Sequence, residues 1–268
     1  ELILVKLGGS LITDKSKPFT ARPSVIRRLG IETKQALDQK KDLKLILAHG
    51  SGSFGHVPAP KYGTARGFSD TRGRIGACIT HDVAAQINRI VIKELLEVGL
   101  SVIGVPPSAI FISTNGKPVK IFIDPILTLL DNGIIPVLYG DVIWDTKRGS
   151  SIFSGETCLK LVSLELIKRG WIITRNIQLG IEKGVLDQHG KIIPLITPVK
   201  FTKLHQKLHQ GISGSKNSDV TGGMLHKVKE SLEMAKSGIE TLIANGEIKG
   251  LAYKTIIGEK VNGTKISI

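Results

Sequence analysis

The stretch LILVKLGGS, residues 2–10, predicts a buried strand that ends in a glycine-rich turn. Residues 2–7 are almost all apolar, which is typical of a strand covered on both faces of a parallel sheet. Gly8 and Gly9 end the apolar run, and Lys6 interrupts it. Because a buried ammonium group without a counter-charge is costly, we expect an anion close to Lys6, although a lysine that reaches solvent past a tight turn is an equal alternative.

Strand and helix patterns alternate from this first strand onward. Apolar residues at helical spacing predict helices over 23–39, 76–98, 125–130, 157–168 and 223–236. Short apolar runs predict strands over 43–48, 101–105, 134–138, 171–174 and 240–244. Hairpins are expected over 141–153 and, around Asn262-Gly263, over 258–268. This order predicts an α/β fold, a three-layer α/β/α sandwich with a mainly parallel open sheet, and we interpret residues 1–268 as one domain.

The positive charge of the chain bears on which kinds of molecule it can bind. Lysine and arginine exceed aspartate and glutamate by 37 to 23, a formal net charge of +14. Nucleic acid, an anionic membrane and anionic small molecules all fit such a balance, and so does a merely solvated lysine-rich surface. The basic residues are scattered and aromatics make up only 4%, which argues against nucleic-acid binding. No apolar run approaches the roughly 18 residues of a membrane span, so neither nucleic acid nor membrane is expected as a partner.

The two cysteines indicate a compartment. Cys78 and Cys158 match no metal-binding spacing, so we expect no metal site in the protein itself and a reduced, cytoplasmic location.

A second glycine-rich corner, HGSGSFGH over 49–56, follows the second predicted strand. Three glycines among serines are typical of a backbone nest that binds anions. His56 could donate a hydrogen bond to a phosphate oxygen, although a single histidine beside a loop is more often an ordinary surface group.

A third corner, SDVTGGMLHK over 218–227, precedes the last long helix. Asp219 or Thr221 can cap that helix, whose N-terminus favours an anion. Lys227 adds a positive charge one turn into it, although a capped helix with an exposed lysine is an equal alternative. Together the three corners supply the cations and N–H donors that phosphoryl transfer requires. The first corner matches neither a Walker A loop nor a dinucleotide fingerprint.

In these motifs the chain resembles the amino acid kinase superfamily, and within it the isopentenyl phosphate kinases. The resemblance is carried by Lys6–Ser10 with Asp14-Lys15, His49–His56, Tyr139–Val142, and Asp219–Met224 with Lys227. These motifs occur in the family's order, and the ending Gly-Ser-Phe-Gly-His is typical of its phosphate-accepting branch. The resemblance implies a homodimer that binds ATP over its C-terminal half, with Mg²⁺ arriving on the ATP. It implies isopentenyl phosphate as the acceptor, over the N-terminal half.

The resemblance also implies a role for each matched residue. Lys6 and Lys15 would stabilise the transferring phosphoryl group and Asp219 would orient the lysines, with His56 as the fourth catalytic residue. Cofactor binding would fall to Gly8, Gly9, Ser10, Gly52, Gly223 and Lys227, and acceptor binding to Ser51, Gly55, His56, Ser154 and Gly155. A phosphate acceptor is already an oxyanion near neutral pH, so this chemistry needs no strong general base. The apolar face from Ile79 to Leu95 could bound an isoprenoid tail, but ordinary core packing explains most of it.

Three departures leave the nucleoside side of the site open. Leu179–Val185 lacks an aspartate that many relatives have, Tyr139 replaces a histidine, and Ser154-Gly155-Glu156 stands where an acidic pair is common. The alternatives are a kinase of a phosphonate such as fosfomycin, a nucleotide-binding regulatory module of the same fold, and, from charge alone, a nucleic-acid-binding protein.

Overall fold

The computed structural model of the chain describes residues 1–209 and 222–268. Its larger sheet contains β1 (Leu2–Leu7), β2 (Lys44–His49), β3 (Val102–Gly104), β6 (Ile135–Tyr139), β9 (Ile173–Gly180), β10 (Leu195–Ile196), β11 (Glu240–Asn245) and β12 (Thr264–Ile266). These eight strands lie in the order β10-β12-β11-β9-β1-β2-β6-β3. All neighbours pair in parallel except β11 and β12. The predicted mainly parallel sheet is confirmed.

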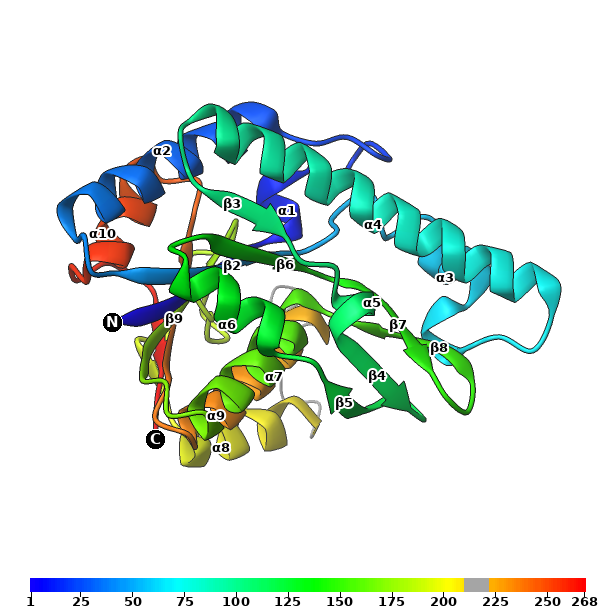
Figure 1. Cartoon of the computed structure of the whole chain (residues 1–268). Coiled ribbons are helices and arrows are strands. Elements are labelled where there is room, and N and C mark those ends of the chain that lie inside the picture. The colour runs from blue at the N-terminus through cyan, green and yellow to red at the C-terminus, as the bar shows by residue number, and fades with distance from the viewer. Residues whose placement is uncertain (210–221) are drawn as a thin grey trace.

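Helices cover both faces of this sheet (Figure 1). One face carries α2 (Pro23–Gln39), α4 (Thr71–Glu97) and α10 (Leu251–Ile257), and the other carries α6 (Asp124–Asp131), α7 (Gly155–Lys168) and α9 (Gly222–Ala235). The remaining helices are α1 (Gly9–Ile12), α3 (Pro58–Tyr62), the 3₁₀ turn η1 (Thr64–Arg66), α5 (Pro107–Ile110) and α8 (Pro198–His209). No helix in the described residues is long and apolar enough to cross a membrane.

The alternation of side chains along β1 decides where Lys6 lies. Ile3 and Val5 belong to the apolar cluster formed with α2, α4 and α10. Leu2 and Leu4 belong to the cluster formed with α6 and α7. Because successive residues of a strand point to opposite faces, Lys6 lies on the same face as Leu2 and Leu4. Its side chain therefore points toward the helix layer that contains α7.

A smaller four-stranded sheet lies under the N-terminal half of α4 (Figure 1). It is formed by β4 (Phe111–Thr114), β5 (Lys117–Ile121), β7 (Asp141–Asp145) and β8 (Gly149–Phe153), in the order β5-β4-β7-β8. The predicted hairpin over 141–153 is β7 with β8. The buried carboxylate of Asp145 accepts N–H bonds from both turns, at 2.7 Å from Gly116 and 3.0 Å from Lys147. One side chain thus joins the two hairpins.

Two of the predicted strands differ from the structure. The strand expected over 171–174 begins later and is longer, because β9 spans Ile173–Gly180. The apolar pattern did not predict its second half, because Asn176 and Gln178 are polar. Both are buried, and their side chains donate to Thr241 at 3.1 Å and to Ser231 at 3.3 Å.

The hairpin predicted over 258–268 is wrong. Only Thr264–Ile266 forms a strand, and it pairs with Thr241–Ile243 of β11. Residues 258–261 instead leave the end of α10 through Gly258, whose φ of 91° is left-handed. The strand after Asn262-Gly263 thus pairs with β11, and not with the residues just before the Asn-Gly turn.

Candidate active site

A cavity of about 560 Å³ opens at the carboxyl ends of β1, β2 and β9, the edge where open parallel sheets bind ligands. The first two glycine-rich corners and the described part of the third meet there. The predicted site residues that line it are Lys6, Gly8, Gly9, Ser10, Lys15, Ser51, Gly52, Gly55, His56, Ser154, Gly155, Gly223 and Lys227. The remaining predicted residue, Asp219, lies outside the described part of the chain.

The first and second corners are in backbone contact. A Cβ atom on Gly52, whose φ is +53°, would lie 2.6 Å from the carbonyl oxygen of Gly9 and 2.1 Å from Oγ1 of Thr13. Thr13 Oγ1 donates to that carbonyl at 2.7 Å and accepts from the Ser53 N–H at 3.0 Å. Any side chain at Gly52 would push the corners apart. Gly9 and Ser10 open α1, so their N–H groups have no acceptor within the helix.

Lys6 forms a buried ion pair with Glu156. The lysine is 4% exposed, and its ammonium donates to Glu156 Oε1. Ser154 caps α7 by accepting from the Thr157 N–H at 3.1 Å, which places Glu156 in the first helical turn. Burial opposes ionisation of Glu156, but the Lys6 ammonium outweighs burial and lowers the pKa of that carboxyl to about 2. The anion expected near Lys6 is therefore a carboxylate of the protein.

Sequence reasoning did not assign Glu156 a role, although a serine N-cap followed by an acidic first turn is a recognisable signal. It also missed Glu182 and His226, which line the same cavity. Glu182 Oε2 lies 3.4 Å from the ammonium of Lys227, and His226 Nε2 lies 3.0 Å from Oγ of Ser154.

Lys15 differs from the other two lysines of the cavity. Lys6 and Lys227 each have a carboxylate partner. Within residues 1–203 and 223–268, no carboxylate forms an ion pair with Lys15, which is exposed on the loop after α1. Its charge is therefore available to an anionic ligand.

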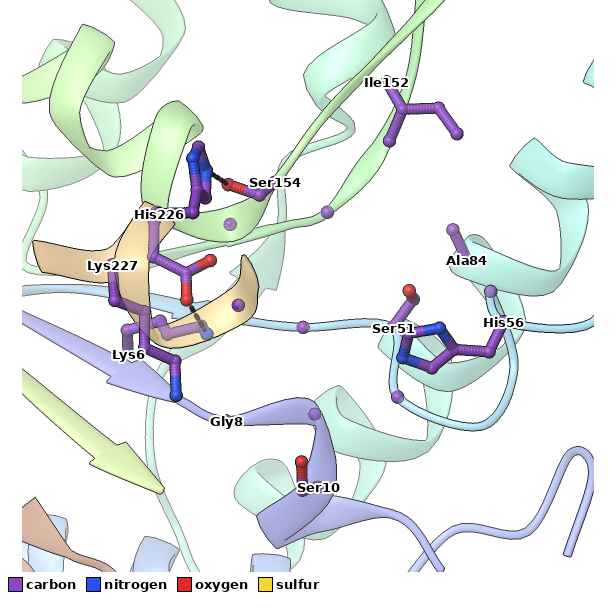
Figure 2. A pocket seen from close by; sticks show the side chains of 18 of the residues that line it. Lys6, Gly8, Ser10, Ser51, His56, Ala84, Ile152, Ser154, His226 and Lys227 are labelled. Atoms are coloured by element: carbon purple, nitrogen blue, oxygen red, sulfur yellow. Dashed lines mark hydrogen bonds and ion pairs between the residues drawn. The ribbon is translucent and has the colours of Figure 1, made fainter. Parts of the chain in front are cut away.

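Ser51 and His56 lie at the other end of the cavity from Lys6 and Lys227 (Figure 2). Partial burial lowers the pKa of His56, and the charge of Lys15 lowers it further. The imidazole is therefore neutral at pH 7 and has one N–H to donate.

The wall beside His56 includes Ala84 and Ile152 (Figure 2). Sequence reasoning assigned no role to these two residues, nor to three others that line the cavity: Ala59, Thr80 and Phe153. Of the face from Ile79 to Leu95, only Thr80 and Ala84 line the cavity, whereas Ile87, Val91 and Leu95 are buried in the core. Core packing was thus the right interpretation for most of that face.

His49, at the end of β2, is buried beneath the second corner. Asn88 Nδ2 lies 3.0 Å from its Nε2 and must donate there, so its Nδ1 donates to the Gly50 carbonyl at 3.1 Å. The ring stacks on Tyr139 with centroids 5.6 Å apart. Burial lowers the pKa of His49 to about 4.

We expect acid to destabilise the fold through His49. Its folded-state pKa lies below the unfolded value, so the unfolded chain binds the proton first and stability falls as pH drops from 6.5 to about 4. The full loss is about 3 kcal/mol. Urea unfolding across this pH range should show a shallower dependence for His49→Gln, because the carboxylates contribute equally to both proteins. Parallel curves would contradict the assignment.

The described residues contain no group of three or more His, Cys, Asp or Glu side chains placed to hold a metal ion. The cations and glycine backbone of the cavity fit a polyphosphate.

The fold and the cavity are those of an enzyme that transfers phosphoryl groups, and comparison with known proteins shows to which family of such enzymes the chain belongs. The sequence model of the amino acid kinase family matches residues 1–245. The chain belongs to the amino acid kinase family.

Within that family, several of the similar proteins are isopentenyl phosphate kinases. An isopentenyl phosphate kinase of Methanothermobacter thermautotrophicus is 30% identical over 99% of both chains. The isopentenyl phosphate kinase of Methanocaldococcus jannaschii is 28% identical over 99% of this chain and 98% of the other. A solved isopentenyl phosphate kinase structure superposes with a TM-score of 0.82 at 27% identity, over 99% of this chain and 100% of the other. The resemblance recognised in the sequence is confirmed.

Proposed function

We propose that this protein transfers the γ-phosphoryl group of ATP to a phosphate oxygen of isopentenyl phosphate, giving isopentenyl diphosphate and ADP. The observation that carries the proposal is the arrangement of the cavity. Ser51 and His56 lie at one end, Lys6 and Lys227 at the other, and Lys15 also lines it. The full-length similarity to isopentenyl phosphate kinases supports the same acceptor.

The reaction needs cations and not a base. An acceptor phosphate oxygen attacks the γ-phosphorus, the bond from that phosphorus to the β–γ bridging oxygen breaks, and ADP leaves with the electron pair. The attacking oxygen carries no proton that must be removed near neutral pH. His56 donates one hydrogen bond to the acceptor, while Lys6 and Lys15 offset the charge on the transferring group.

The nucleotide is assigned to Gly8–Ser10, Gly52, Gly223 and Lys227, and the acceptor to Ser51, Gly55, His56 and Ser154-Gly155. Mg²⁺ is proposed to bind mainly to phosphate oxygens of ATP, because Glu156 and Glu182 already pair with lysines. Asp219 is retained as a residue that orients the lysines. A homodimer is carried over from the resemblance. A single domain is retained from the order of strands and helices, and a cytoplasmic location is retained because the free Cys78 and Cys158 agree with a reducing compartment.

The test is ADP release from Mg-ATP with isopentenyl phosphate, dimethylallyl phosphate, fosfomycin and uridylate offered in parallel. The highest kcat/KM is expected for isopentenyl phosphate. A preference for fosfomycin would support the phosphonate alternative, and ATP binding without turnover of any acceptor would support a regulatory module.

His56→Ala is expected to raise the KM for isopentenyl phosphate about tenfold or more, because a hydrogen bond to a charged phosphate is lost. The KM for ATP should stay within about twofold, since His56 lies away from Lys6 and Lys227 (Figure 2), at the end proposed for the acceptor. Steady-state kinetics with each substrate varied in turn measures both. His189→Ala, at an exposed turn outside the cavity, serves as the control, and an unchanged acceptor KM and kcat would remove His56 from the site.

A further inference from the structure

Glu182 occupies the segment after β9 that departs from the family pattern, and it lies at the phosphate-handling end of the cavity. Its Oε2 atom is 3.4 Å from the ammonium of Lys227, and the two side chains are only 23% and 16% exposed. Figure 2 shows Lys227 beside Lys6 at this end. The contact is therefore formed inside the cavity and not on the open surface.

Gly180 creates the space for this carboxylate. A Cβ atom at Gly180 would lie 2.3 Å from Glu182 Oε2, while the next nearest atoms, also of Glu182, would be 3.5 Å and 3.7 Å away. The backbone at Gly180 does not have the positive φ that demands glycine. Glycine at position 180 thus leaves room for the Glu182 carboxylate, and it is not required by the backbone conformation.

At this end of the cavity each lysine faces a carboxylate. Glu156 pairs with Lys6, and Glu182 pairs with Lys227. Burial disfavours ionisation of Glu182, but Lys227 lowers its pKa overall. A phosphate anion that approaches Lys227 therefore meets a carboxylate already in place and must compete with it for the ammonium.

We propose that Glu182 is a displaceable counter-ion for Lys227: it neutralises the lysine in the free enzyme and is replaced by nucleotide phosphates on binding. This rests on the nucleotide role proposed for Lys227. Its consequence is that Glu182 weakens nucleotide binding, so that product ADP leaves faster than it would from an unopposed lysine. A residue that merely supported the structure of the site would have the opposite effect when removed.

Calorimetric titration of the whole protein with Mg-ADP tests the proposal without any acceptor. Glu182→Gln removes the charge but keeps the shape, and it is expected to tighten the Kd about three- to fivefold, the range of a partly exposed ion pair. Gly180→Ala pushes the carboxylate away from Lys227 without changing it, and should tighten the Kd in the same direction. The double variant should show no further gain, because both changes free the same lysine.

Glu240→Gln is the matched control, since Glu240 pairs with Lys265 away from the cavity and its loss should leave the Kd unchanged. Unchanged or weaker Mg-ADP binding in Glu182→Gln would overturn the proposal, as would additive gains in the double variant. Wild-type protein that binds Mg-ADP without phosphorylating isopentenyl phosphate would contradict the proposed acceptor alone, and the variants would still decide this inference. Wild-type protein that binds no Mg-ADP would overturn both.

Discussion

Lys6→Met is expected to lower kcat by about 10³, because the cation proposed to face the transferring phosphoryl group is lost inside a buried site. The same change leaves the Glu156 carboxylate buried without its partner. Breaking a buried ion pair from one side costs about 3–5 kcal/mol of folding stability. Steady-state kinetics and urea unfolding of the same preparation measure the two losses.

The double variant Lys6→Met/Glu156→Gln separates these losses. Neutralising Glu156 removes the unpaired buried charge, so most of the lost stability should return. The turnover should remain low, because no cation has been restored. Recovery of kcat together with stability would show that Lys6 acts only by supporting the fold.

Lys15→Ala is expected to lower kcat by about 10² while leaving both KM values within about twofold, since its charge is proposed to act mainly in the transition state. The side chain is exposed and forms no ion pair with the described residues. Stability should therefore change by less than about 0.5 kcal/mol.

Lys17→Ala provides the matched control for Lys15. Lys17 is exposed on the same loop and does not line the cavity. It should leave kcat unchanged, which distinguishes one positioned ammonium group from the general positive charge of the loop. A loss confined to KM in Lys15→Ala would mean that this lysine binds substrate and does not stabilise the transition state.

The layered fold could be predicted because its signals are local. Residues 2–7 are nearly all apolar, and α2 has the bounds Pro23–Gln39 that the helical spacing predicted. Features held by distant partners could not be predicted. Glu32 of α2 caps the start of α10, because its carboxylate accepts from the Gly250 and Ala252 N–H groups at 2.9 Å each. Glu32 precedes Gly250 by 218 residues in the sequence. Nothing near residue 250 reveals this partner.

The site divides in the same way. Glycine-rich corners after strands are visible in sequence, and the carboxyl ends of neighbouring parallel strands bring them together. The charge pairing is not visible, because Lys6 and Glu156 lie 150 residues apart. The sequence therefore indicated that an anion could lie near Lys6. It did not show that this anion is Glu156, because that depends on how α7 is placed over β1.

The wall beside His56 has a consequence for how such an enzyme can diversify. Ala84 belongs to α4 and Ile152 to β8 of the small sheet, whereas Lys6, Gly8 and Lys227 belong to β1, the turn that follows it, and α9. In the proposed binding mode, the surface that faces the acceptor's organic portion and the groups that face phosphates thus belong to separate elements. In that binding mode, substitutions at positions 84 and 152 would alter which acceptors bind and would leave the residues proposed to contact phosphates unchanged.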